Sequence, residues 1–178
     1  MMRRDGESLR EIWDFLFAPA HCCLRYAGAM DLFSENSEKL TPMTQRAQNR
    51  CFGCGPANDT GLQLEFLLAG DGSVVCLTTI PDRFEGPEGY LHGGIIATLL
   101  DEAMSKSVRA LGLTAMTRQM EVEYLRPVHS GAPLRLEGRL VRSERRNHWT
   151  EARILSPRGH VLAEGKGLFI EVRSGHRS

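Results

Sequence analysis

A pair of glycines that opens a long apolar segment dominates the middle of this 178-residue sequence. His92-Gly93-Gly94 precedes Ile95 to Arg109, in which apolar residues recur at helical spacing. This period predicts one long helix that begins near the glycines and ends at Gly112, which serves as its C-terminal cap. Asp101 and Glu102 interrupt the apolar pattern. A helix with so wide an apolar face must be covered by other elements, so it constrains the whole fold.

The segments around this helix alternate apolar and polar residues, which is typical of strands. Before the helix, Gly61 to Phe66 and Val74 to Ile80 are predicted to form a hairpin across the turn Gly70-Asp71-Gly72. After it, the candidate strands are Gln119 to Pro127, Pro133 to Arg142, His148 to Leu155 and Val161 to Val172. We therefore predict the α+β class, with an antiparallel sheet wrapped around one long central helix.

The length suits one domain with a full core. Residues 46–174 are predicted to form that domain. Residues 1–45 are predicted to be an N-terminal extension that is either poorly ordered or folded into a short amphipathic helix at Ser8 to Phe17. The change of composition near Met43 motivates the hypothesis that residues 1–42 precede the natural start, which an intact mass of the natural protein tests.

Charge and hydropathy exclude several classes of partner. Lysine plus arginine and aspartate plus glutamate both number 22, so no net field attracts nucleic acid or an anionic membrane surface. No run of about 18 apolar residues occurs, so no membrane span is predicted. Met1 to Ala20 contains four acidic residues and lacks the apolar run of a signal peptide. We therefore expect a cytoplasmic protein.

Cys51 and Cys54 have the spacing of a pair of zinc ligands. A tetrahedral zinc site needs about four ligands, and the sequence offers no second pair at this spacing. A packed turn is therefore favoured over zinc, and no metal is expected. The odd total of five cysteines fits a reducing compartment.

The segment from His92 to Met104 resembles the helix signature of the hotdog-fold acyl-CoA thioesterases, especially their PaaI and THEM4-like branch. Cys51 to Gly55, Tyr124 to Val128 and the Gly159 to Gly167 hairpin also resemble that branch. The resemblance covers about Cys51 to Val172. It implies a hotdog fold and hydrolysis of an acyl-CoA to free acid and CoA, with CoA entering only as part of the substrate and no cofactor. It also implies a homodimer or homotetramer with active sites at the subunit interface.

Hydrolysis of a thioester requires a hydrogen-bond donor for the negative charge that grows on the carbonyl oxygen. A backbone amide at a helix start supplies such a donor, already oriented and supported by the helix dipole. The resemblance assigns this role to Gly93, with His92 and Gly94 shaping the turn. The alternative is that the two glycines only permit tight packing.

The resemblance also assigns to Asp101 the role of nucleophile or of general base on the attacking water. The alternative is an exposed helix carboxylate, paired with Ser105 or Lys106. Glu102 points about 100° away around the helix, so we expect it to be a structural or solvent-facing acid.

The spacing of these groups bears on the assembly. Asp101 lies eight residues beyond Gly93, which is about 12 Å along a helix axis, so one thioester carbon cannot contact both groups. Because the family's sites are interfacial, we expect the amide and the acid of one site to come from different subunits. Thr117 matches a hydroxyl position that orients the water in similar enzymes, although threonine also favours strands.

Substrate-binding candidates flank the helix in the sequence. Glu85 and Gly86 lie in a loop predicted to shape the mouth of a pocket, and Gly86 replaces a polar amide that is frequent in the wider family. Arg145 and Arg146 are candidates for the CoA phosphates, or else a solvated sheet edge. Because Gly86 lacks a polarising side chain, a non-catalytic acyl-CoA or acyl-carrier binding dimer is the alternative function.

Overall fold

The computed structural model describes residues 40–172, which lie within the larger of the chain's two units, residues 36–178. The proposed helix at Ser8 to Phe17 lies outside the described residues. In chain order, the elements are β1 (Thr41–Pro42), β2 (Leu67–Leu68), β3 (Val74–Thr79), the 3-10 turn η1 (Asp82–Phe84), α3 (Gly93–Arg109), β4 (Ala115–Tyr124), β5 (Pro133–Glu144), β6 (Asn147–Leu155) and β7 (Val161–Glu171).

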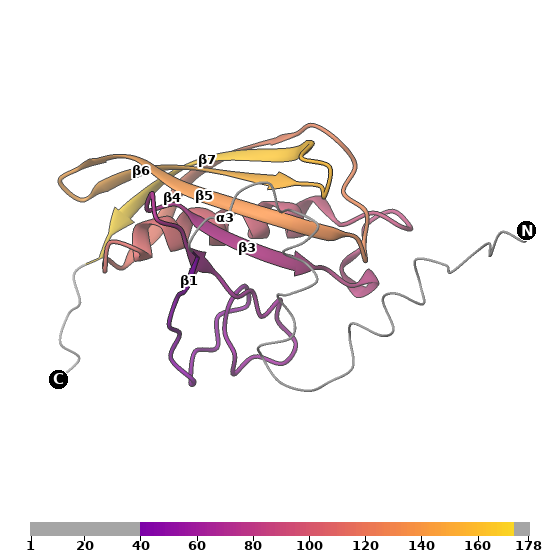
Figure 1. The fold of residues 1–178 in the computed structure, drawn as a ribbon, viewed down its shortest axis with the longest axis horizontal. Helices are drawn as coiled ribbons and strands as arrows, with labels where there is room; N and C mark the ends of the chain where they lie inside the picture. The colour runs from indigo at the N-terminus through magenta and orange to yellow at the C-terminus, as the bar shows by residue number, and fades with distance from the viewer. Residues whose placement is uncertain (1–39, 173–178) are drawn as a thin grey trace, which may run out of the picture. The chain divides into compact units, whose positions relative to one another are not determined.

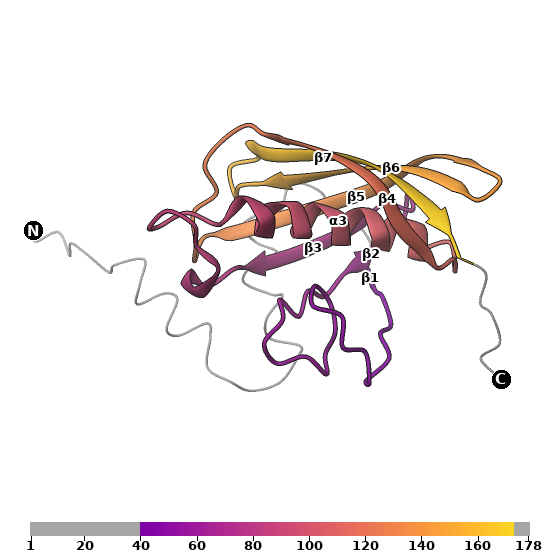
Figure 2. The ribbon, with the colours of Figure 1, turned by 180° about the vertical axis from the view of Figure 1, so that it is seen from behind.

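The strands form one seven-stranded sheet in the order β1-β2-β3-β5-β6-β7-β4, and every neighbouring pair is antiparallel. Helix α3 runs along one face of this sheet, as Figures 1 and 2 show. The predicted α+β architecture is therefore confirmed. Among the described residues, no helix is long and apolar enough to cross a membrane.

The core lies between α3 and the sheet. The helix buries seven residues against it: Ile96, Leu99, Leu100, Ala103, Met104, Ser107 and Val108. Burial of each large apolar side chain contributes about 1.5–3 kcal/mol, so the burial of this face holds the helix on the sheet. Gly138 of β5 permits the close approach, because a β-carbon there would overlap the carbonyl oxygen of Ala103.

Three boundaries differ from the sequence predictions. The prediction of a strand at Gly61 to Phe66 is wrong. Gln63 has a φ of 49°, which no regular strand residue adopts, and the strand that pairs with β3 is β2 instead. Strand β4 begins at Ala115, earlier than predicted, because its first residues pair with the end of β7. The helix ends at Arg109, and Gly112, with a φ of 78°, follows its C-cap.

Two further observations concern the region before the helix. Strand β1 falls within residues 1–45 and pairs with β2. The peptide N–H groups of Leu62 and Leu64 donate to the carbonyl oxygens of Phe52 and Gly53 at 2.8 and 2.9 Å. The alternating leucines therefore anchor the cysteine-containing turn instead of forming a strand.

Candidate active site

The start of α3 carries a free backbone donor. His92 is the N-cap, with extended φ and ψ angles of −60° and 138°, and its Nδ1 accepts a hydrogen bond from the Gly94 N–H at 2.9 Å. The ring therefore carries its proton on Nε2 when neutral. The Gly93 N–H makes no hydrogen bond to any residue in 40–172, as expected of a first-turn amide. An unpartnered first-turn amide of this kind can donate to a ligand.

Tyr124, at the end of β4, lies beside this amide. Its hydroxyl donates to the Gly93 carbonyl oxygen at 3.1 Å, and a β-carbon at Gly93 would lie 3.7 Å from its ring. Its side chain is 54% exposed, so it forms one wall of the helix start and still meets solvent. Tyr124 was not among the predicted site residues, and its place at the head of the Tyr124-Leu125-Arg126-Pro127 segment is the one sequence signal that points to it.

Asp101 lies two turns further along α3 and contacts the beginning of β4. The Thr117 hydroxyl donates to Asp101 Oδ1 at 2.7 Å, so the structure brings these two predicted residues together. Burial raises the pKa of Asp101 above its ordinary value; the Thr117 hydrogen bond opposes this shift, and the charge of Glu102 adds to it. A half-buried carboxylate with a raised pKa is a stronger base than an exposed one.

Lys106, one of the two alternative partners expected for Asp101, contacts the cysteine-containing turn instead. The ammonium group of Lys106 donates to Cys54 Sγ at 3.0 Å, and the carboxylate of Glu102 accepts from Cys51 Sγ at 3.1 Å. Glu102 is thus a structural acid, which is one of the two roles expected for it.

The loop before the helix packs against His92, the N-cap residue of α3. The Ser130 hydroxyl donates a short hydrogen bond to Glu85, which lowers the pKa of that carboxyl. A β-carbon at Gly86 would lie 3.3 Å from the His92 Cα, so any side chain there would crowd the N-cap. The absence of a side chain at Gly86 therefore leaves the N-cap uncrowded.

The two candidate arginines lie at the tip of the β5–β6 hairpin. Arg146 donates from Nε and Nη2 to the carbonyl oxygen of Glu171 at 3.0 and 2.7 Å, which ties the hairpin to the end of β7. Arg145 has a φ of 53° in the turn and is exposed. Of the two guanidinium groups, that of Arg145 is more available to a phosphate.

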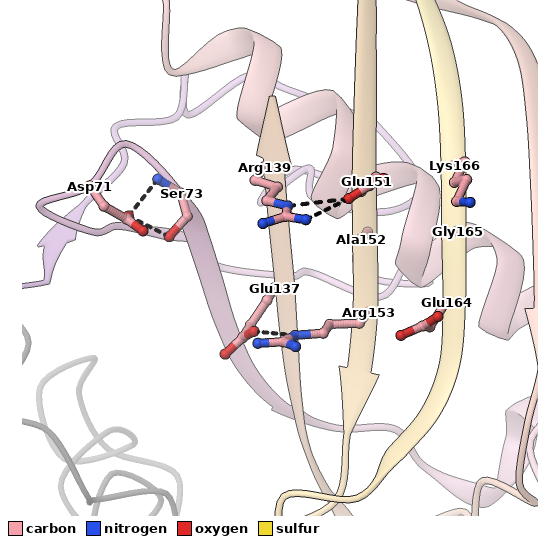
Figure 3. A pocket seen from close by; sticks show the side chains of 11 residues that line it. Asp71, Ser73, Glu137, Arg139, Glu151, Ala152, Arg153, Glu164, Gly165 and Lys166 are labelled. Carbon is pink, nitrogen blue, oxygen red and sulfur yellow. Dashed lines mark hydrogen bonds and ion pairs between the residues drawn. The ribbon is translucent and has the colours of Figure 1, made fainter. Parts of the chain in front are cut away.

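A hollow of about 310 Å³ lies on the opposite face of the sheet (Figure 3). Its charged side chains are largely paired with each other. Glu137 lies 2.6 Å from Arg153, and Arg139 lies 2.7 Å from Glu151. None of Asp101, Gly93 or Thr117 lines it. The hollow is therefore separate from the candidate active site.

Known proteins are similar to this chain in sequence and in fold. The Thioesterase superfamily profile matches residues 88–163. Acyl-coenzyme A thioesterase THEM4 of Xenopus laevis is 31% identical over 138 residues, which cover 75% of this chain and 62% of that protein. The chain thus spans less than two thirds of this curated relative.

Solved structures give the same result at the level of the fold. Escherichia coli PaaI, from the phenylacetic acid degradation operon, has a TM-score of 0.59 at 19% identity, covering 63% of this chain and 81% of that one. A hypothetical thioesterase of Streptococcus pneumoniae TIGR4, crystallised with coenzyme A, has a TM-score of 0.55 at 27% identity, covering 61% and 86%. A third solved structure, of a thioesterase superfamily protein, has a TM-score of 0.57 at 31% identity, covering 63% of this chain and 86% of that one. The chain, with one long helix on a seven-stranded antiparallel sheet, therefore belongs to the thioesterase superfamily; it has the hotdog fold and is similar to the PaaI and THEM4 proteins.

Proposed function

We propose that this protein hydrolyses an acyl-CoA thioester to free acid and CoA. The observation that carries the proposal is the pair formed by Asp101 and Thr117, a half-buried carboxylate held by a hydroxyl 2.7 Å away. The THEM4 relative is named an acyl-coenzyme A thioesterase, and the pneumococcal thioesterase was crystallised with coenzyme A. Both names support an acyl-CoA as the substrate class.

In the proposed reaction, Asp101 acts as nucleophile on the carbonyl carbon or as general base on the attacking water. The raised pKa favours either role, because a stronger base accepts a proton more readily. The Thr117 hydroxyl holds Oδ1, and this fixes the direction in which Oδ2 points. Coenzyme A takes part only as the leaving thiol, and the step needs no organic cofactor.

The Gly93 amide is proposed to bind the carbonyl oxygen as negative charge develops on it. The amide is oriented by the first turn of α3 and lies at the positive end of the helix dipole. His92 and Gly94 position it, because their side-chain-to-backbone hydrogen bond fixes the turn. One such donor is worth about 3–4 kcal/mol of transition-state stabilisation.

We propose that a complete site needs two copies of the chain. The Gly93 amide and Asp101 are separated by about 12 Å along one helix, too far for one reacting carbon. Strand β4 is an edge strand with mostly exposed residues, and α3 leaves Asp101 half-exposed beside it. An antiparallel pairing of two β4 strands would cover this edge and bring the Gly93 of one copy toward the Asp101 of the other. A homodimer, or a homotetramer of two such dimers, follows.

The test of the activity is a panel of short-chain, long-chain and aryl acyl-CoAs, with release of free thiol as the measurement. We expect thiol release from at least one substrate and a loss of about 10²–10⁴-fold in kcat for Asp101→Asn. Glu164→Gln, on the outer face of the sheet, is the matched control and should leave kcat unchanged. Binding of acyl-CoA without release, equal in wild type and Asp101→Asn, would instead favour the non-catalytic binding dimer.

The test of the shared site is complementation between two inactive variants. Gly93→Pro removes the amide donor, and Asp101→Asn removes the acid. Mixed by unfolding and refolding at equal amounts, half of the dimers are mixed and each contains one intact site, so about a quarter of wild-type activity should return. Each variant refolded alone is the control. No recovery above these controls, with mixed dimers present by native mass spectrometry, would rule out the shared site.

A further inference from the structure

Two thiols, a carboxylate and an ammonium group meet where the cysteine-containing turn contacts α3. Cys51 Sγ donates to Glu102 Oε1 at 3.1 Å across 51 residues of sequence, and the Lys106 ammonium donates to Cys54 Sγ at 3.0 Å. The two sulfur atoms and a carboxylate oxygen of Glu102 all lie within 4.8 Å of one another. The proposed thioesterase reaction uses none of these four groups.

The backbone of the turn is shaped around this contact. A β-carbon at Gly53 would overlap the side chain of Glu102, so only glycine allows that carboxylate to lie over the turn. The Gly55 N–H donates to the Cys51 carbonyl oxygen at 2.9 Å, and the Cys51 N–H donates to Asn49 Oδ1 at 3.0 Å. The turn therefore holds both thiols on the side where Glu102 arrives.

We propose that Cys51, Cys54 and Glu102 bind a zinc-class divalent cation, with solvent in the fourth position. Thiolate sulfur and carboxylate oxygen are the ligands that zinc takes in tetrahedral sites. The sequence argued against zinc because it offered no ligand beyond the cysteine pair. In the structure, Glu102 of α3 supplies a third ligand. Because Cys51 is exposed and Cys54 is buried, the site opens to solvent on one side, which gives the ion an entry path.

The charges of the cluster suit such an ion. Binding converts both thiols to thiolates and releases two protons, so two thiolates and one carboxylate surround a doubly charged cation. One negative charge then remains, and the Lys106 ammonium, 3.0 Å from Cys54 Sγ, offsets it while it donates to the coordinated sulfur.

A metal accounts for the cluster better than a Cys51–Cys54 disulfide does. Both cysteines are free, and each sulfur contacts a polar group of α3, which is Glu102 for Cys51 and Lys106 for Cys54. A bound zinc ion takes its cysteine ligands as thiolates. A disulfide also gives no reason for Glu102 to lie over the turn.

The experiment uses the full chain carrying Cys22→Ser and Cys23→Ser, which removes two thiols outside the described residues. The protein is reduced, freed of reductant under nitrogen, and titrated with Zn²⁺ or Co²⁺ alone. We expect about one metal ion per chain by elemental analysis, absorption from cobalt–thiolate charge transfer, and about two protons released per zinc. Cys51→Ser and Glu102→Gln should each weaken binding at least about tenfold, because each removes one protein ligand.

Glu164→Gln is the matched carboxylate control and should bind like wild type. Because Cys51 is exposed, Cys51→Ser should keep the wild-type melting curve without metal, so a loss of binding reports on ligation. No binding to the reduced protein, full binding by Cys51→Ser, or equal binding by Glu102→Gln and Glu164→Gln would each overturn the site. Thioesterase activity is not the readout, so failure here leaves the proposed function intact.

Discussion

One side chain, that of His92, makes the peptide N–H of Gly93 differ from the neighbouring N–H of Gly94. The His92 imidazole occupies the Gly94 N–H at 2.9 Å, and the Gly93 N–H is left without a partner in residues 40–172. Histidine is an uncommon N-cap, because serine, threonine, aspartate and asparagine do the same with shorter side chains. Its ring here closes the turn by accepting from the Gly94 N–H.

Gly93 allows this donor to be deleted without rebuilding the backbone. It is the first residue of α3, where proline is tolerated, and the preceding His92 has the extended angles that proline requires. We predict that Gly93→Pro lowers kcat by about 10²–10³-fold relative to Gly93→Ala. Alanine keeps the N–H, and its β-carbon makes ordinary contact with Tyr124 at 3.7 Å. Steady-state kinetics on both variants measures the difference, and equal kcat values would exclude the amide as the donor.

Among the elements, the close contact between α3 and the sheet depends on small residues at the crossing. Gly138 of β5 faces the Ala103 carbonyl, and Gly165 of β7 faces Leu100 and Met104. Larger residues at these positions would push the helix away from the strands. The position of Asp101 relative to Thr117 is set by the same contact, because one residue is on the helix and the other on the sheet.

We therefore predict that Gly138→Ala lowers the free energy of unfolding by about 1–3 kcal/mol or more, because the new β-carbon overlaps backbone that cannot move aside. Gly70→Ala is the control, since a β-carbon there meets nothing within 4 Å and the glycine does not have a positive φ. Urea unfolding of both variants gives the comparison. A Gly138→Ala protein as stable as the control would mean that the helix does not pack this closely.

The outer face of the sheet is stabilised by charge. Glu137 accepts from Arg135 Nε and Arg153 Nε, both at 2.6 Å. Burial disfavours its ionised form, but the two arginines outweigh this and hold the pKa of Glu137 below its ordinary value. Its contribution to stability is thus fully present above pH of about 4.3 and is lost as the pH falls through the depressed folded-state pKa.

We predict that Glu137→Gln costs about 1–2 kcal/mol of unfolding free energy at pH 7. The difference from wild type should shrink at acid pH, once the carboxyl is protonated in the wild type as well. Chemical denaturation at pH 7 and at pH about 3 measures this, with Glu164→Gln as control. A difference that is constant with pH would show that the ion pairs do not carry the effect.

At the scale of the whole molecule, the proposed assembly gives each subunit two separated halves of a site. The proposed dimer predicts that specific activity depends on protein concentration, because a separated chain has no complete site. Specific activity should be constant at high concentration and fall on dilution, with its midpoint at the dimer dissociation constant from sedimentation. Cross-linking before dilution is the control and should preserve activity. A monomer with full specific activity would contradict the proposed assembly.

The sequence by itself determined the elements whose signal is local. The apolar period from Ile95 to Arg109 predicted α3, and strand-like runs bounded by turn residues predicted β3, β5, β6 and β7 close to their observed bounds. Apolar periodicity reflects burial on one face, so it can be read without knowing what covers that face. The resemblance at His92 to Met104 then led to the family.

Only the tertiary structure decided what depends on partners distant in sequence. Leu62 and Leu64 alternate like a strand but bond to the cysteine-containing turn, and Tyr124 lies beside Gly93 although 31 residues separate them. Glu102 contacts Cys51 across 51 residues of sequence, so no local spacing could reveal Glu102 as the proposed third metal ligand. These contacts form because the sheet folds over the helix, and a sequence pattern records which residues are buried but not which residues they meet.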